Sequence, residues 1–309
     1  MKKILLIPTI AAIFFFSCKR EHSASNISPS GKKYKVSFNV KNFTQQQSTF
    51  SVGKKVYALP SDTVTNLPSY LDLLYYVAYN NVDRAMNPPQ IQDSTMANMG
   101  MITDSLPAGN YRMYFVAGKK GLALNSYGVL GEAAFGYGPA GWQDTFWGTT
   151  GNVTVGNANI NKDITLNRVV TKIELQILDN IPANADSLKI TIQYDDAIMF
   201  FDKGYLGPGS TSPAAVVAIK IPDAAKGHPL TIDKIFGNTL DPVTVDILCK
   251  NASGTVLGHA IVNNVLGGQN TKVVIAGNLF NSGNPSSSPQ SFTVKVDTAW
   301  NNTPLHSGF

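Results

Sequence analysis

Charged residues are scarce in this 309-residue chain, at 15% of the total, against about a quarter in typical soluble proteins. Hydrophobic residues have an ordinary share, 43%. The polar surface must therefore come mostly from Asn, Ser, Thr and Gln, as in many secreted β proteins. The net charge of +5 arises from scattered basic residues without interleaved aromatics. Nucleic-acid binding is not indicated.

Cysteine and histidine are also few. The four histidines lie far apart, with no Cys or carboxylate at ligand spacing, so we expect no metal site and no cofactor. Of the two cysteines, Cys249 follows Val243, Val245 and Ile247 at period two. This spacing puts its thiol on the apolar face of a strand, where we interpret it as a small buried hydrophobe rather than a reactive group.

Motifs of common enzyme classes are missing or incomplete. Neither a GxSxG elbow nor an HExxH helix occurs. Residues 136–141 have the GxGxxG spacing, but Pro139 removes a backbone donor and no helix pattern follows. Asp195, Asp196 and Asp202 fit no calcium loop, since an apolar segment separates them, and we interpret them as turn residues. We therefore expect a protein that is not an enzyme and has no catalytic residues.

The N-terminus has the pattern of an export signal. Lys2 and Lys3 precede an apolar run, residues 4–16, that only Pro8 and Thr9 interrupt. As a helix this run spans roughly 20 Å, too short for the ~30 Å of membrane hydrocarbon and suited to a signal peptide.

Ser17 and Cys18 end the apolar run, and the chain turns polar at once. This ending resembles the lipobox of bacterial lipoproteins. The resemblance implies cleavage before Cys18, with the thiol carrying a diacylglycerol and the new amine an acyl chain. Bulky Phe15 and Phe16 depart from the usual pattern, and the alternative is an ordinary signal peptide with a chance cysteine. The prediction is a signal peptide over residues 1–17 and a lipidated flexible tether over 18–33.

Beyond residue 33 the dominant pattern is alternation of apolar and polar residues. In the first such segment, Tyr34, Val36, Phe38 and Val40 share one face. About fourteen short strands separated by turn residues are too many for one sandwich. We predict an all-β fold of two tandem antiparallel β-sandwich domains, residues 34–167 and 168–300, with a tail over 301–309.

Residues 119–151 differ, being rich in glycine and large aromatics with little alternation; residues 127–134 fit a helical turn or two. The rings of Tyr137, Trp142 and Trp147 have two interpretations. They are either core residues or, within the segment 135–148, a stacking platform for a glycan. Core is favoured because each large ring removes roughly 150–250 Å² from water.

Three blocks carry a family resemblance: residues 106–111, residues 166–175 followed by 179–183, and residues 261–280 followed by a last strand ending at Trp300. Together they resemble the fimbrillin and fimbrial-anchor families of Bacteroidetes. The subunits of these families build pili from two transthyretin-like β-sandwiches. The resemblance implies a non-enzymatic fimbrial subunit whose partners are other subunits, joined by β-strand addition.

The two ends of the folded chain are the candidates for strand exchange. They comprise Tyr34, Val36, Phe38 and Val40 in the first strand, and Phe292, Val294, Val296 and Trp300 in the last. In polymerising fimbrillins a cut after arginine removes the first strand, but this chain has no arginine between Arg20 and Arg84. We therefore expect an anchor or accessory subunit that keeps its first strand.

The expected location is the outer membrane, through the lipid on Cys18. Exported surface lipoproteins of these bacteria often carry acidic residues after the cysteine, whereas Lys19 and Arg20 come first here. The cell surface or fimbrium and the periplasmic face therefore both stay open. The alternative function is a surface glycan-binding lipoprotein or adhesin that uses the aromatic segment.

Overall fold

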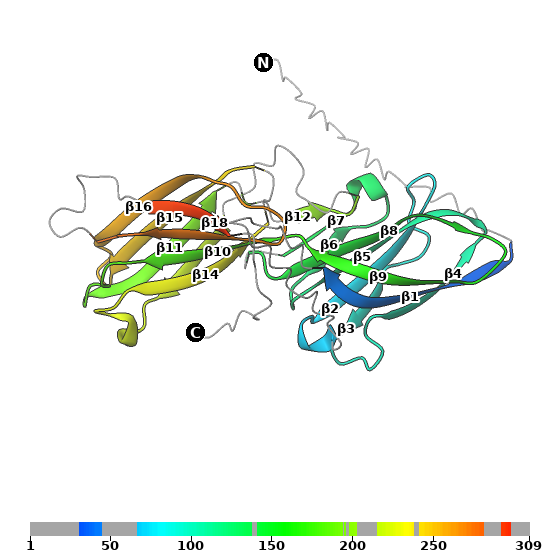
Figure 1. Cartoon of the computed structure of the whole chain (residues 1–309), viewed down its shortest axis with the longest axis horizontal. Coiled ribbons are helices and arrows are strands. Elements are labelled where there is room, and N and C mark those ends of the chain that lie inside the picture. The colour runs from blue at the N-terminus through cyan, green and yellow to red at the C-terminus, as the bar shows by residue number, and fades with distance from the viewer. Residues whose placement is uncertain are drawn as a thin grey trace, which may run out of the picture. The chain divides into compact units, whose positions relative to one another are not determined.

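The computed structural model describes residues 31–44, 67–137, 141–193, 195, 198–202, 215–237, 241–280 and 292–297. These residues form strands joined by turns and three short 3-10 helices (Figure 1). The strands before residue 170 are β1 (Lys33–Thr44), β2 (Leu73–Asn80), β3 (Gln90–Asp93), β4 (Met101–Pro107), β5 (Gly109–Gly118), β6 (Ala123–Ser126), β7 (Ala134–Gly136), β8 (Thr145–Val155) and β9 (Ile160–Arg168). The later strands are β10 (Thr171–Ile177), β11 (Ala185–Gln193), β12 (Ile198–Phe200), β13 (Ala215–Lys220), β14 (Leu230–Phe236), β15 (Val243–Asn251), β16 (Val256–Val265), β17 (Thr271–Gly277) and β18 (Phe292–Asp297). The 3-10 helices are η1 (Leu67–Ser69), η2 (Leu130–Glu132) and η3 (Asp223–Ala225).

Seven strands form the first large sheet, in the order β3-β2-β5-β8-β9-β1-β4. Alternate residues of six of these strands meet in one apolar core that includes Phe38, Tyr76 and Phe115, so the sheet curls around that core. Its two edge strands come close enough for side-chain bridges. The Gln92 amide donates to the Met101 carbonyl (2.9 Å) and accepts from the Gly100 N–H (2.8 Å). These side-chain bonds supply edge β4 with partners that an eighth strand would otherwise provide.

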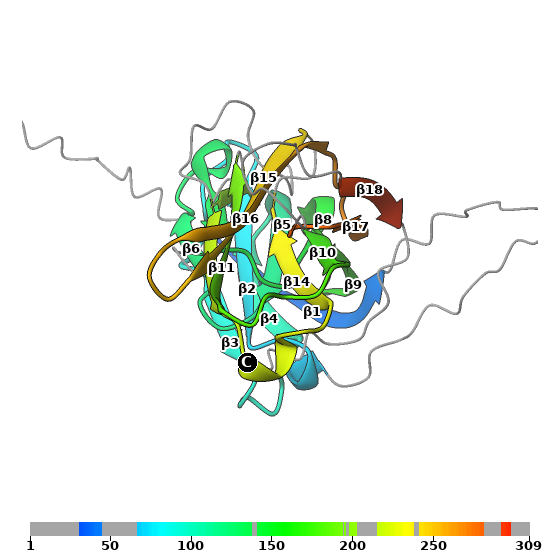
Figure 2. The same ribbon diagram turned by 90° about the vertical axis from the view of Figure 1, so that its left-hand side faces the viewer.

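The later strands form two four-stranded sheets, β14-β10-β17-β18 and β13-β11-β15-β16 (Figure 2). Their inward residues form a second core, which includes Ile173, Ile247 and Ile275. Cys249 lies in this core, fully buried, and burial raises the pKa of its thiol to about 11. The prediction that this side chain is buried is confirmed.

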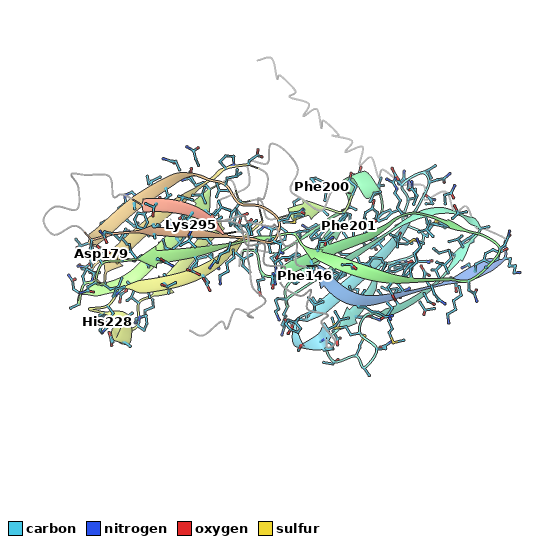
Figure 3. All side chains as sticks on the ribbon, viewed as in Figure 1. Phe146, Asp179, Phe200, Phe201, His228 and Lys295 are labelled. Carbon is cyan, nitrogen blue, oxygen red and sulfur yellow. The ribbon has the colours of Figure 1, made fainter. Side chains whose placement is uncertain are left out.

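A third apolar cluster covers the other face of β2 and β5. A small sheet, β12-β7-β6, supplies part of it. Phe135 on β7 meets Phe201, which follows β12, at a ring-centroid distance of 5.4 Å. Figure 3 labels Phe201 beside its neighbour Phe200. The cluster also holds Val169 and Ile235, so it draws residues from both sides of the boundary predicted at 167/168.

Arg168 makes a buried ion pair at that boundary. Its Nε and Nη2 donate to the two carboxylate oxygens of Asp144 (2.6 and 2.9 Å), and its Nη1 donates to Oδ1 of Asn270 (2.9 Å). The guanidinium also lies 5.0 Å from the ring centre of Phe146. A bidentate, largely buried pair of this kind stabilises the fold and also fixes the relative orientation of the two side chains. Arg168 thus ties the segment before β8 to the turn before β17.

The predicted all-β sandwich class is confirmed, and one detail of it is wrong. The sheets are not purely antiparallel, because β1 pairs parallel with β9 and β10 pairs parallel with β17. The helical turn expected within 127–134 is present as η2. The boundaries assigned to the two domains stay predictions.

Replacing Arg168 by Met should lower the free energy of unfolding by about 3 kcal/mol, because the Asp144 carboxylate loses its partner in a largely dry site. Urea unfolding followed by circular dichroism measures this. Lys41→Met is the matched control. Its pair with Asp163 (3.0 Å) is exposed on both sides, so its loss should cost less than about 1 kcal/mol. Equal effects of the two variants would contradict the assignment.

Candidate functional site: the first and last strands

The first strand, β1, is held on both sides. It pairs antiparallel with β4, from Lys33 opposite Pro107 to Asn39 opposite Met101, and parallel with β9. Its inward residues Val36, Phe38 and Val40 are buried, and Tyr34 is partly buried against the same core. The ring of Phe38 lies 5.3 Å from that of Phe115 and 5.6 Å from that of Tyr76. Apolar burial and two ladders of hydrogen bonds therefore both hold β1.

This position has a chemical consequence for exchange. If β1 left, β4 and β9 would each lose a hydrogen-bonded neighbour, and the core beneath Phe38 would open to water. Backbone groups and apolar pockets of that kind are what an incoming strand needs. In the described state, however, β1 fills the place completely.

Among the described residues, the last strand, β18, has a hydrogen-bonded neighbour on one side only. It lies at the edge of its sheet and pairs antiparallel with β17. Val294 and Val296 stand opposite Ile275 and Val273, which are fully buried. Residues opposite each other in an antiparallel pair point to the same face, so both valines point toward the core side of the sheet. They are nevertheless 40% and 48% exposed.

Only Phe292 of β18 packs against the core. Lys295 lies on the opposite face and is exposed (Figure 3). Trp300 falls outside the described residues. The candidate exchange residues thus divide into a deeply buried set on β1 and a half-exposed set on β18.

Two of the three aromatic side chains considered for glycan stacking, those of Tyr137 and Trp142, are buried. Tyr137 and Trp142 are 4% and 3% exposed and belong to the third cluster. The Tyr137 hydroxyl accepts a hydrogen bond from the Lys119 N–H (2.8 Å), and burial raises its pKa to about 12. Trp147 is partly buried and donates from Nε1 to the Phe201 carbonyl (2.9 Å). The burial of Tyr137 and Trp142 favours the interpretation of these two rings as core residues.

The close packing of Trp142 against Gly237 also favours the core interpretation. A Cβ added to Gly237 would fall 2.2 Å from the Trp142 indole nitrogen. Only a glycine therefore lets the two segments approach so closely. The sequence shows the aromatic composition but not this partner, which lies far along the chain.

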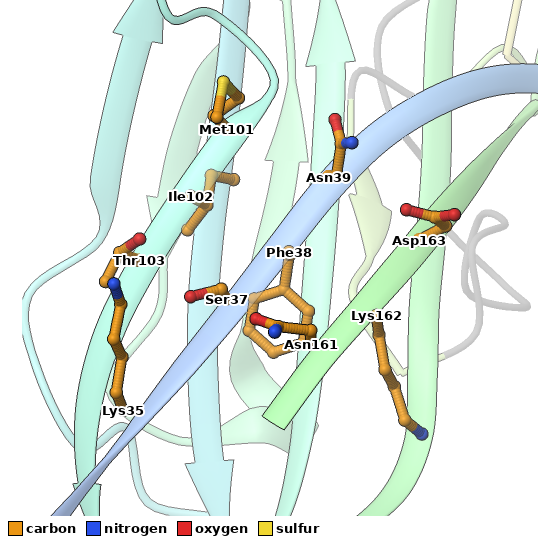
Figure 4. Close-up of a pocket in the computed structure, with 10 residues that line it drawn as sticks. All are labelled: Lys35, Ser37, Phe38, Asn39, Met101, Ile102, Thr103, Asn161, Lys162 and Asp163. Carbon is orange, nitrogen blue, oxygen red and sulfur yellow. The ribbon is translucent and has the colours of Figure 1, made fainter. Parts of the chain in front are cut away.

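A shallow hollow of about 500 Å³ lies beside β1 (Figure 4). Lys35, Ser37 and Asn39 of β1 form its middle. Met101 and Thr103 of β4 line one side, and Asn161, Lys162 and Asp163 of β9 line the other. Phe38 and Ile102 also line it, so its wall is apolar as well as polar. This hollow was not among the sites predicted from sequence, because three separate segments build it.

Other predicted features give little further chemistry. Cys18 lies outside the described residues. Asp195 is buried and accepts from the Gly237 N–H (2.7 Å), while Asp196 is not described. Among the described residues, no group of His, Cys, Asp and Glu is arranged to hold a metal ion. The same part of the chain contains no helix of the length and apolarity needed to span a bilayer.

Comparison with known proteins identifies the fold. No family model and no curated protein matches the sequence, whereas 41 chains of solved structures match the fold. The fimbrial anchor protein Mfa2 from Porphyromonas gingivalis aligns over 86% of this chain and 98% of its own, with a TM-score of 0.53 and 8% identity.

Two proteins of Bacteroides thetaiotaomicron are similar to a comparable degree. One is a candidate adhesin, with a TM-score of 0.52 and 8% identity over 88% of this chain and 98% of its own. The other is a candidate polysaccharide-binding protein, with a TM-score of 0.52 and 10% identity over 79% and 92%. The resemblance to the Bacteroidetes fimbrial proteins is confirmed at the level of the fold.

The two strands should respond very differently to truncation. Phe38→Ala should lower the free energy of unfolding by about 3–5 kcal/mol, since it empties a buried aromatic site. Val294→Ala should cost less than about 1 kcal/mol, because its side chain is already half exposed. Chemical unfolding of both variants measures the difference. A Val294→Ala cost near that of Phe38→Ala would show that β18 is as firmly held as β1.

Proposed function

We propose that this chain is a non-enzymatic fimbrial subunit, anchored in the outer membrane by a lipid on Cys18. It serves at the base of the fibre or as an accessory component, and it joins neighbouring subunits by β-strand addition. The fold it shares with a fimbrial anchor protein supports the role of fimbrial subunit. The difference between the firmly held β1 and the loosely held β18 supports assembly by donation of the last strand.

The way β1 is held supports a subunit that keeps its first strand. Releasing this strand exposes three buried apolar side chains, each worth roughly 1.5–3 kcal/mol when fully buried, together with two hydrogen-bond ladders. The nearest arginines, Arg20 and Arg84, lie outside the strand. Cleavage after Arg20 would release the lipid but leave β1 in place. Both observations favour a subunit whose own groove stays closed.

The way β18 is held supports donation of this strand to another subunit. The strand has a single hydrogen-bonded neighbour within the described residues, and its two valines lie half exposed on the core side. Detaching it therefore costs little apolar burial. In another subunit's groove the same valines would become fully buried. That gain in burial is a driving force for donation.

The burial of Tyr137 and Trp142 makes glycan binding by the aromatic segment the less favoured function. Whether the protein faces the medium or the periplasm is a separate question. External protease added to intact cells answers it, since only a surface-exposed subunit is digested.

Replacing Cys18 should abolish lipidation of the protein, whereas replacing Cys249 should not. Cells fed an alkyne analogue of palmitate should label the wild-type protein and Cys249→Ala equally, and Cys18→Ala not at all. Gel fluorescence after click labelling is the measurement. Label retained on Cys18→Ala would mean that the protein is not a lipoprotein of the proposed kind.

Donation should depend on the valine face of β18. Val294→Ser combined with Val296→Ser should leave the melting temperature nearly unchanged. It should nonetheless reduce recovery of the protein with sheared fibres by tenfold or more, because the donated strand can no longer fill apolar pockets. Thr293→Ser combined with Lys295→Ser, on the opposite face, is the matched control.

Immunoblotting of purified fibres reads out both variants. The proposal fails if the valine variant joins fibres as efficiently as the control. It also fails if a strain lacking the gene makes fibres of normal length that stay attached to the cells.

A further inference from the structure

Three lysines that are distant in the sequence come together on the sheet β13-β11-β15-β16 (Figure 1). Lys220 of β13 and Lys250 of β15 both stand opposite Ser187 of β11, one on each side of it. Lys189 follows Ser187 by two residues, so its side chain points to the same face of the sheet. Because neighbouring strands are about 4.8 Å apart, the backbones of the three lysines lie within roughly 10 Å of one another.

This face of the sheet points away from the core. Leu188 and Cys249, which alternate with the lysines along β11 and β15, are fully buried. Side chains of neighbouring residues in a strand point to opposite faces. In agreement, Lys189 and Lys220 are exposed and Lys250 is partly exposed.

Little negative charge offsets these lysines. The four strands contain two acidic residues, Asp186 and Asp246. Asp246 is bonded to His259 (2.9 Å), and Asp186 lies at a bulge in β11. Asp223, just beyond β13, is paired with Lys226 (2.6 Å). Within the part of the chain that the structure describes, none of the three lysines forms an ion pair.

The other sheet of the same sandwich differs, because it neutralises its own charge. On its outer face Lys172 pairs with Asp233 (2.7 Å) and Lys272 pairs with Glu174 (3.3 Å). Two lysines there have two carboxylates. The excess of positive charge is therefore specific to the sheet that carries β11 and β15.

Aliphatic side chains lie beside the lysines on the same face. Ala218 and Leu248 flank Lys189, and Val216 and Ile261 stand at the two ends of the next row across the strands. Val216 is 47% exposed and Ile261 is 54% exposed. Grouped apolar side chains with a polar border are typical of contact surfaces. We call the following residues the basic sheet face: Lys189, Lys220, Lys250, Val216, Ala218, Leu248 and Ile261.

The size of this face limits what it can do alone. Four strands at about 4.8 Å spacing, over about six residues at 3.4 Å each, give roughly 250–400 Å². A stable protein interface uses about 800 Å² on each partner. The basic sheet face therefore suits a weak contact that works together with another attachment.

The mixture of charge and apolar surface indicates the partner. Two copies of the chain placed face to face would bring lysines against lysines, which disfavours self-association. A phosphate-rich partner would leave the aliphatic side chains uncovered. A protein surface with an apolar centre and an acidic rim would cover both parts, as in ordinary protein interfaces.

We propose that the basic sheet face binds an acidic surface of another fimbrial subunit, as a second contact beside the donated strand. The proposal rests on the proposed function and adds to it the chemistry of the partner. Charge complementarity speeds association and selects the partner. Two linked contacts also hold more firmly than either does alone.

Co-sedimentation with fibres from a strain lacking the gene tests the proposal. The protein is the mature chain with Cys18→Ser, and immunoblotting measures its share in the fibre pellet. Replacing Lys189, Lys220 and Lys250 by Glu should reduce that share at least tenfold, because the acidic partner is then repelled. The matched control replaces Lys33, Lys35 and Lys120 by Glu. These lysines are exposed elsewhere, so the control should bind within twofold of wild type. Equal losses in the two variants would overturn the proposal.

Salt and the aliphatic residues provide a second test. Raising the salt from about 50 to about 500 mM should remove the difference between wild type and the lysine variant, since screening weakens surface charges. Leu248→Ser combined with Ile261→Ser should reduce binding about fivefold at both salt concentrations. The control is Val82→Ser combined with Leu178→Ser, at aliphatic residues that are exposed elsewhere. Full binding by the Leu248 and Ile261 variant would contradict a protein partner on this face.

Competing polyanions test the class of partner. A short DNA duplex, or vesicles with about 30% phosphatidylglycerol, should displace the protein from the fibres only at high concentration. Tighter binding to either competitor than to the fibres would overturn the choice of a protein partner.

The valine variant of β18 separates this proposal from the proposed function. If the lysine variant binds like wild type while the valine variant does not, the basic sheet face is refuted and strand donation stands. If only the lysine variant loses binding, the basic sheet face stands and strand donation fails. Absence of wild-type binding to the fibres would overturn both.

Discussion

The insertion of β1 between β4 and β9 is the constraint on which the first half of the structure depends. The chain enters the fold through this strand, yet its two neighbours come much later in the sequence. The core around Phe38 is complete only when all three segments meet. Such non-local closure makes β1 costly to remove, and it puts the first exposed lysines on the outer face of the sheet.

The second half repeats the same arrangement. Its first strand, β10, lies between an antiparallel neighbour, β14, and a parallel one, β17. In both sheets the parallel neighbour has a further strand beside it, β8 in the first and β18 in the second, but β18 is the last strand of its sheet. A buried first strand and a loosely held last strand thus occur in one chain. This pairing of a closed groove with an available strand suits a subunit that gives a strand without receiving one.

Alternation in the sequence was enough to predict β1, since only one of its faces is buried and side-chain polarity therefore changes at period two. The strands β2 and β5 are buried on both faces, so alternation is weaker in them. The strands β8 and β9 were harder, since Gly148, Gly151 and several exposed polar residues interrupt their patterns. The parallel pairs were missed because alternation specifies which face is buried but not which strand is the neighbour.

The functional features divide in a similar way. A signal-like N-terminus and the apolar faces of the first and last strands are local patterns, and the sequence displays them. Burial of Trp142 is decided by Gly237, which lies far along the chain. Local reasoning therefore left two interpretations of the aromatic rings open.

The parallel pairing of β1 with β9 has a mechanical consequence. If the chain is anchored and assembled as proposed, tension on the fibre would pull β1 from its N-terminal end and β9 from its C-terminal end, where the chain continues into β10. In parallel neighbours those two ends lie at opposite ends of the ladder. The pull then acts along the strands, and the hydrogen bonds between them share the load rather than breaking one after another. The pair β10 and β17 is loaded in the same sense, so each half places a shear-resistant junction in the line of force.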